Sequence, residues 1–171
     1  MRIPTASILI LAVCSSTPWG QAEQKYYGHG YAYTAPGFGN YRSGQRPSAM
    51  EFGGGGEVLV HKGLTIGADI GRLHVDAAKY SIESNLILLS VNGAYHFGAR
   101  KSGAKVVPFI TWGGGYGWER RQGGGSGTTV NLGGGVQYWF QKRMALRLEV
   151  RDTFLSENFH HLGFRVGLAF R

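Results

Sequence analysis

One short segment combines the side chains that a hydrolase or a metal site would need. Residues 156–161 are Ser-Glu-Asn-Phe-His-His and supply a hydroxyl, a carboxylate and two imidazoles. A serine nucleophile needs a base within reach and an acid that orients the base, which are the types of Ser156, His160 and Glu157. His160, His161 and Glu157 could instead bind a metal, but neighbouring strand residues point to opposite faces, which strains joint ligation. The segment is predicted to be a flexible loop without a catalytic motif, so we expect no catalytic residue, metal or cofactor there.

Glycine runs are the other feature that could suggest ligand chemistry. They lie at 53–56, 113–115, 123–125 and 133–135. None has the Gly-x-x-x-x-Gly-Lys-Ser/Thr form of a phosphate-binding loop, and none opens a helix. The chain also has 9 Phe, 9 Tyr and 4 Trp, which argues against a disordered glycine-rich chain. In a small closed barrel, glycine relieves crowding where strands bend or where a large neighbour fills the interior.

Charged residues alternate with apolar residues in several segments. Residues 146–152, Leu-Arg-Leu-Glu-Val-Arg-Asp, are the clearest case. This pattern is typical of a strand with one face in lipid and the other in a polar interior. An eight-stranded barrel is just wide enough for side chains to fill it, and buried charges must pair. We therefore expect a salt-bridge network that plugs the interior, with an ion path as the alternative, formed by Glu57, Asp69, Arg147, Glu149, Arg151 and Arg165.

Eight segments have the alternation and length of membrane-crossing strands. They are Lys25–Thr34, Ala49–Val60, Leu64–Leu73, Asn85–Phe97, Val106–Trp118, Thr128–Phe140, Ala145–Thr153 and Leu162–Arg171. The prediction is an all-β fold, an eight-stranded antiparallel up-and-down transmembrane β-barrel. Closure is expected because open sheet edges are not tolerated in lipid. A soluble lipocalin-like barrel, with the apolar face inward, remains an alternative.

The connections are expected to alternate between long and short. Long ones are predicted at 35–48, 74–84, 119–127 and 154–161, and shorter ones between them. With the N-terminus in the periplasm, the long connections would lie outside the cell. Aromatic residues would form interfacial girdles. The lower girdle would comprise residues 95–97, residues 138–140 and Phe170, and the outer girdle Tyr116, Trp118, Phe154 and Phe164.

The first 22 residues are typical of a secretion signal. An apolar run at 6–13 precedes the small-x-small site Gly20-Gln21-Ala22, so cleavage is expected after Ala22. Residues 23–171 would then form the barrel domain. A lipoprotein acylated at Cys14 is the alternative, although Val13 is bulky for that site. Cleavage after Ala22 would remove the one cysteine, which excludes disulfides and thiolate chemistry.

The formal net charge is +8 at pH 7. We do not expect the cations to cluster into a patch, since many lie singly in strands or turns. We therefore expect no nucleic-acid partner. Outer-membrane lipid and the phosphates of lipopolysaccharide are more natural partners for an exported basic protein.

The C-terminal segment resembles the signal by which the outer-membrane assembly machinery recognises its substrates. The carrying residues are Gly163, Val166, Leu168 and Phe170. One residue, Arg171, follows the final aromatic, which departs from the pattern. The resemblance implies that the assembly machinery is a partner of this chain.

Six glycine- and aromatic-rich segments carry a resemblance to a known family. They are residues 53–59, 64–71, 91–97, 107–116, 131–140 and 146–152. Over residues 25–171 the chain resembles the outer membrane protein β-barrel domain family, the small OmpA-like barrels. This implies a fold and an outer-membrane location. We expect a monomeric, non-enzymatic barrel with a structural or surface-interaction role. A narrow porin-like channel, an outer-membrane lipid-modifying enzyme and a soluble binder are the alternatives.

Overall fold

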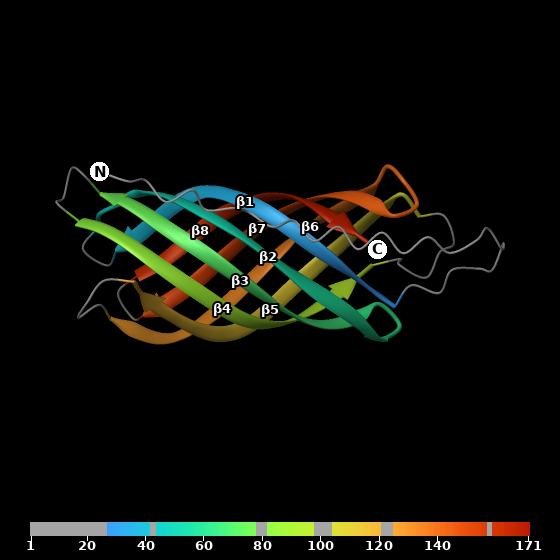
Figure 1. The fold of residues 1–171 in the computed structure, drawn as a ribbon, viewed down its shortest axis with the longest axis horizontal. Coiled ribbons are helices and arrows are strands. Elements are labelled where there is room, and N and C mark those ends of the chain that lie inside the picture. Colours follow the sequence, from blue (N-terminus) through green and yellow to red (C-terminus); the bar gives the residue numbers. More distant parts are fainter. Residues whose placement is uncertain (1–26, 42–43, 78–81, 98–103, 121–124, 157–158) are drawn as a thin grey trace, which may run out of the picture.

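The computed structural model is a closed barrel of eight antiparallel strands in sequence order (Figure 1). It describes residues 27–41, 44–77, 82–97, 104–120, 125–156 and 159–171. The strands are β1 (Gly28–Tyr41), β2 (Ser48–His61), β3 (Leu64–Ala77), β4 (Ile82–His96), β5 (Val106–Glu119), β6 (Ser126–Trp139), β7 (Met144–Ser156) and β8 (Phe159–Phe170). The predicted fold is thereby confirmed. No helix in the described part of the chain is long and apolar enough to cross a membrane.

The first and last strands close the barrel. β1 pairs with β8 from Gly30↔Phe170 onward. Because the number of strands is even, β1 begins and β8 ends at the same end of the barrel, which we call the terminal end. The predicted signal peptide and its cleavage site lie outside the described residues.

Several strands run further than their apolar alternation predicted. β1 continues from Thr34 to Tyr41, and β3 continues from Leu73 to Ala77. Backbone pairing needs no apolar side chains, so the ladders extend past the lipid-facing band. Pro36 is accommodated in β1 because its pairing with β8 lapses: Thr34↔Val166 is followed by Gly37↔Gly163.

The predicted asymmetry of the connections was wrong. The connections at the end opposite the termini comprise residues 42–47, 78–81, 120–125 and 157–158. Those at the terminal end comprise residues 62–63, 97–105 and 140–143. The longest connection therefore lies at the terminal end. Length alone does not orient this barrel, so a periplasmic terminal end stays a prediction that rests on export.

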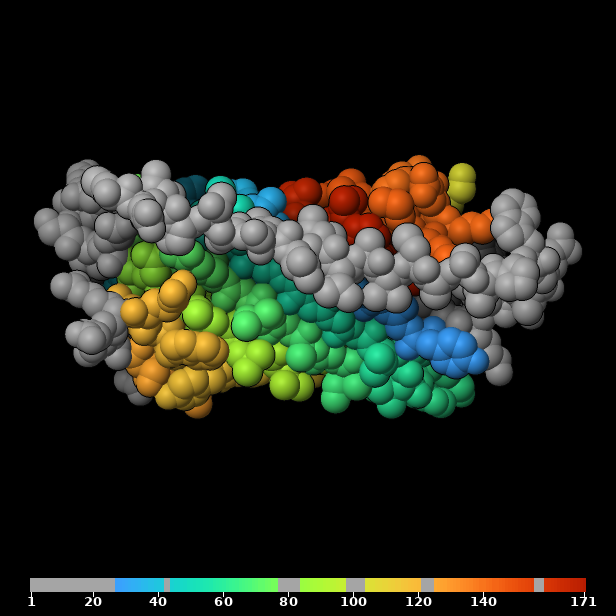
Figure 2. All heavy atoms as spheres, viewed as in Figure 1, coloured from blue at the N-terminus to red at the C-terminus, as the bar shows by residue number. Residues whose placement is uncertain are grey.

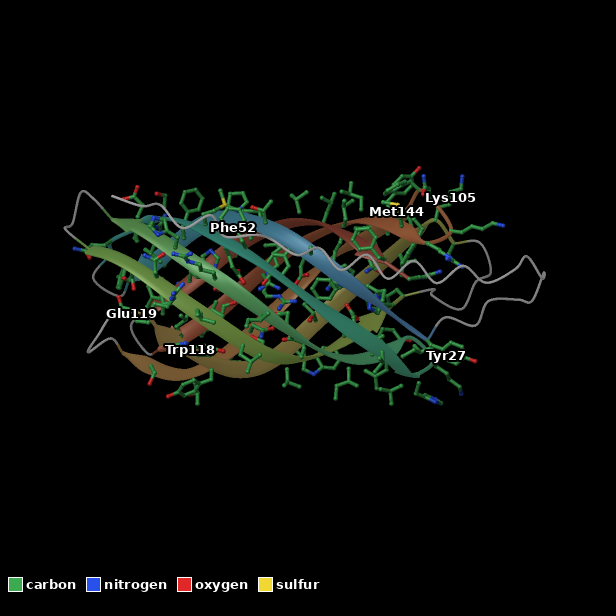
Figure 3. All side chains as sticks on the ribbon, viewed as in Figure 1. Tyr27, Phe52, Lys105, Trp118, Glu119 and Met144 are labelled. Carbon is green, nitrogen blue, oxygen red and sulfur yellow. The ribbon has the colours of Figure 1, made fainter. Side chains whose placement is uncertain are left out.

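Apolar side chains cover the outside of the barrel and polar ones fill the inside. Figure 3 shows oxygen- and nitrogen-bearing sticks gathered within the barrel and carbon-only sticks projecting from it. Leu132, Val130 and Val91 are among the outward residues, at 63%, 61% and 58% exposure. Side chains of β2, β3 and β4 cover the wall in the space-filling view (Figure 2). This polarity is opposite to that of a soluble lipocalin-like barrel, which is therefore excluded.

The predicted lower aromatic girdle is present with two exceptions, whereas Phe164 of the predicted outer girdle lies in the middle of β8. Tyr95, Phe97, Tyr138, Phe140 and Phe170 project outward near the terminal end. His96 and Trp139, however, are buried inside the barrel. Strand alternation explains both cases, since each lies between two outward-facing aromatic residues.

Candidate functional site: the polar interior

All six residues predicted to face the interior lie inside the barrel and contact one another. β7 supplies Arg147, Glu149 and Arg151 at alternate positions, so that all three point inward. β2 supplies Glu57, β3 supplies Asp69 and β8 supplies Arg165. Each of these six residues is at most 6% exposed.

With Glu51, these residues form a continuous ion ladder of alternating sign. Its successive N···O distances begin at the terminal end with Glu57–Arg147 at 2.6 Å and Arg147–Glu149 at 3.1 Å. The middle bridges are Glu149–Arg151 at 2.5 Å and Arg151–Asp69 at 2.9 Å. Asp69–Arg165 at 3.4 Å and Arg165–Glu51 at 2.8 Å complete it. Three arginines and four carboxylates give the ladder a net charge of −1.

Neutral polar side chains brace the carboxylates along the ladder. Tyr33 donates a hydrogen bond to Glu51 at 2.7 Å, and Asn92 donates one to Asp69 at 2.8 Å. Thr65 donates one to Glu57. Three of the four carboxylates therefore have hydrogen-bond partners besides arginine, which helps to offset the cost of burying their charges.

Aromatic rings lie against two of the three ladder arginines. The Arg147 guanidinium lies 4.1 Å from the Phe109 ring centroid and 4.5 Å from that of Tyr31. Arg165 lies 4.1 Å from the Tyr33 centroid. At these distances, cation–π attraction adds to the salt bridges of both guanidinium groups.

Two buried histidines at the terminal end of the ladder were not predicted. His96 Nε2 lies 2.8 Å from Glu57, and His29 Nε2 lies 3.4 Å from the same carboxylate. Sequence analysis placed neither residue in the interior network. Strand alternation could have placed both, because His29 shares a face with Tyr31 and Tyr33.

Glu51 and His161, at the other end of the ladder, were also missed. Glu51 is separated from Glu57 by an even number of positions in β2, and His161 is so separated from Arg165 in β8. Because the glycine run 53–56 lies between Glu51 and Glu57, the alternation of side chains could not be followed from one to the other. His161 Nδ1 lies 3.8 Å from Glu51, and the histidine is 1% exposed.

Apolar clusters lie at both ends of the polar ladder. Ala49, Leu73, Val75 and Leu88 are buried together near the end opposite the termini. The cluster that reaches the terminal end contains Val107, Trp139, Ala145 and Ala169 with Tyr31, Tyr33 and Ala35. The interior is therefore packed with side chains, with charges in its middle.

The segment considered for catalysis is not a loop where the structure describes it. His160 and His161 lie in β8 and point to opposite faces, as alternation requires. His160 Nδ1 contacts the Asp152 carboxylate at 2.9 and 3.1 Å and stacks on Phe154. Glu157 and the Ser156 side chain lie outside the described residues, so the predicted nucleophile and acid are not placed. No group of three metal-ligating side chains occurs in the described part of the chain.

The residues of the predicted assembly signal lie in β8. Val166, Leu168 and Phe170 project toward lipid, and Gly163 faces the interior. Their recognition by the assembly machinery stays a prediction.

Comparison with known proteins agrees with this geometry. The family model of the outer membrane protein beta-barrel domain matches residues 6–171. The chain belongs to this family. The barrel accordingly resides in the outer membrane, as predicted. No curated protein matches the sequence.

Solved structures share the fold at low sequence identity. Neisserial surface protein A matches with a TM-score of 0.70 and 13% identity, over 84% of this chain and 96% of that chain. Ail, the attachment invasion locus protein of Yersinia pestis, matches with a TM-score of 0.61 and 9% identity, over 84% of this chain and 97% of that chain. The outer membrane enzyme PagL matches with a TM-score of 0.57 and 14% identity, over 82% of this chain and 99% of that chain. At these identities the likeness concerns the fold.

Proposed function

We propose that this barrel is a non-enzymatic outer-membrane protein with a closed interior and a structural or surface-interaction role. The ion ladder between two apolar clusters is the observation that carries the proposal. Buried bridges at 2.5–3.4 Å occupy the space that a solute would have to cross. Contacts with other molecules therefore involve the outer wall and the two rims.

The rival channel function is tested by planar bilayer recordings on the protein isolated from the outer membrane. A filled interior predicts no stable conductance above the bilayer background. The double variant Glu149→Ala/Arg151→Ala, which removes the middle of the ladder, is the control for an opened interior. A stable large conductance from the unaltered barrel would refute the closed interior.

Surface interaction is the more specific part of the proposal. The names of two proteins of similar fold, a surface protein and an attachment protein, support it. Cells that produce the barrel should adhere to host-type or abiotic surfaces better than cells from which the gene is deleted. If deletion leaves adhesion unchanged but sensitises cells to detergent, the role is structural; if deletion changes neither property, the proposal fails.

We infer that lipopolysaccharide and the assembly machinery are the partners of a monomeric barrel. The outward apolar wall and the β8 residues Val166, Leu168 and Phe170 support this inference. Replacing Phe170 by serine should reduce the amount of folded barrel in the outer membrane. The same replacement at Phe38, an exposed phenylalanine of β1, is the control.

A lipid-modifying enzyme is the remaining alternative. His160 and Asp152 have the relation of a base and its orienting acid, and they lie half-buried on the outer face of the barrel. Among the described residues, the hydrogen bonds of His160 involve Asp152 alone. The non-enzymatic proposal predicts the same lipid A profile, by mass spectrometry, with and without the gene. A difference that His160→Ala abolishes would establish an enzyme instead.

A further inference from the structure

The fold gathers exposed cations at the terminal end that are dispersed in the sequence. Lys105 precedes β5, Lys142 and Arg143 lie between β6 and β7, and Arg171 follows β8. All four are exposed, as is Lys62 in the turn between β2 and β3. Figure 3 shows Lys105 at the same end of the barrel as Tyr27, which precedes β1. The expectation that the positive charges do not cluster was therefore wrong.

Four of these cations belong to one stretch of the rim, which we call the basic patch: Lys105, Lys142, Arg143 and Arg171. The Lys105 carbonyl accepts a hydrogen bond from the Trp139 amide at 2.7 Å. The Arg143 carbonyl accepts one from the Arg171 amide at 3.0 Å. The Arg171 guanidinium lies 3.6 Å from the Trp139 ring centroid. The ends of β5, β6, β7 and β8 at the terminal end of the barrel therefore hold these four residues close together.

The acidic residues of the described chain lie elsewhere. Glu51, Glu57, Asp69 and Glu149 are inside the barrel. The others are on strands near the opposite end, at Asp76, Glu83, Glu119 and Asp152. Within the described residues, no carboxylate lies within 4.0 Å of the charged groups of Lys62, Lys105, Lys142 or Arg143. Three of the four patch cations, Lys105, Lys142 and Arg143, therefore have no carboxylate partner among the described residues.

The height of the patch on the barrel decides which anion it meets. Val106, next to Lys105, pairs with Tyr138, and Met144, next to Arg143, pairs with Phe170. Tyr138, Phe140 and Phe170 project outward, each 45% exposed. Such aromatic rings lie at the level of lipid headgroups. The cations therefore lie where headgroup phosphates surround the barrel.

We propose that the basic patch binds the headgroup phosphates of anionic phospholipids in the leaflet at the terminal end. On the predicted orientation this is the periplasmic leaflet. Basic residues beside a membrane attract anionic headgroups within about one Debye length. A soluble acidic partner is disfavoured because the cations adjoin the outward aromatic band, whose neighbours are lipids. The proposal goes beyond a structural or surface role and can fail without affecting it.

Native mass spectrometry of the protein isolated from the outer membrane in detergent tests the proposal. The probes are phosphatidylglycerol and phosphatidylcholine with identical acyl chains, added as an equimolar mixture. The unaltered barrel should retain the anionic lipid over the neutral one by about tenfold. The triple variant Lys105→Gln/Lys142→Gln/Arg143→Gln should retain the two lipids within about twofold of each other.

A matched triple variant at the opposite end is the control. Arg46, Arg72 and Arg120 are exposed there, and their replacement by glutamine should leave the preference intact. The proposal is overturned by an unaltered barrel without preference, by a patch variant that keeps it, or by an opposite-end variant that loses it. Patch-dependent binding of soluble polyglutamate without lipid preference would also overturn it and indicate a soluble acidic partner.

Salt dependence keeps the proposal testable if the patch variant does not fold, as judged by heat-modifiable migration on a gel. Raising ammonium acetate to about 0.5 M shortens the Debye length to a few ångströms. The preference of the unaltered barrel should then disappear. A preference that persists would mean that acyl-chain contacts select the lipid, which contradicts the proposal.

Discussion

Removing an arginine from the interior ladder should cost more than removing its terminal carboxylate. Arg151 bridges Glu149 at 2.5 Å and Asp69 at 2.9 Å and is 2% exposed. In Arg151→Met, Glu149 keeps only Arg147, and Asp69 keeps only Arg165 among its cations. The net charge of the ladder changes from −1 to −2. Breaking a buried pair in this way costs about 3–5 kcal/mol of unfolding free energy.

Glu51→Gln is the matched variant, which changes the net charge of the ladder in the opposite direction. It removes the charge at the end of the ladder and brings the net charge from −1 to zero. The glutamine oxygen still accepts the Tyr33 hydrogen bond, and Arg165 keeps Asp69 at 3.4 Å. The expected cost is about 1–2 kcal/mol, that of weakened hydrogen bonding to a charged group.

Urea unfolding in phospholipid vesicles, followed by tryptophan fluorescence, measures both costs. With a slope of about 2 kcal/mol/M, a loss of about 4 kcal/mol lowers the midpoint by about 2 M, whereas Glu51→Gln lowers it by less than about 1 M. Equal shifts for the two variants would refute the charge-balance argument. A shift below about 0.5 M for Arg151→Met would show that the ladder does not stabilise the barrel.

Further predictions concern packing, lipid contact and closure. Gly71→Ala should destabilise the barrel by about 1–3 kcal/mol in the same urea assay, because its Cβ would lie 2.6 Å from Glu51 and 2.9 Å from the Tyr33 hydroxyl. The control Gly30→Ala meets nothing closer than 3.7 Å and should cost less than about 1 kcal/mol. Leu132→Arg places a charge midway along β6 and should cost about 2–4 kcal/mol, against about 0–1 for Thr128→Arg near the rim; equal costs would contradict a lipid-facing wall. Finally, the unboiled barrel should migrate faster than the boiled chain on a detergent gel, and identical migration would argue against a closed barrel.

The period-2 pattern was sufficient to predict the architecture and the interior face. Arg147, Glu149 and Arg151 could be assigned to the interior because they occupy alternate positions of one strand. If one face of that strand contacts lipid, the charged side chains must be on the other face. The strand ends could not be predicted in the same way. His74 and Asp76 interrupt the apolar alternation of β3, yet the backbone continues to pair to Ala77.

The pairing of charges across the barrel was beyond the sequence pattern. Arg147 and Glu57 are 90 positions apart, and their contact depends on the stagger between β2 and β7, which alternation does not specify. The inward orientation of the two histidines could in principle have been predicted from the sequence. Assigning His29 and His96 required an alternation count extended through strands whose outward partners are glycines as well as apolar residues.

The basic patch illustrates a different limit of sequence analysis. Lys105 and Arg143 lie in different connections, and only the end-to-end alternation of the strands places both at one rim. In an up-and-down barrel every second connection shares an end, so charge should be counted separately for odd and even connections. Counted together with the adjoining strand ends, the described residues of the even side carry cations and no exposed acidic side chain, while the odd side carries Arg46 and Arg120 together with Asp76 and Glu119. The asymmetry between the two ends, rather than the total charge of +8, is therefore the quantity that bears on which leaflet the barrel contacts electrostatically.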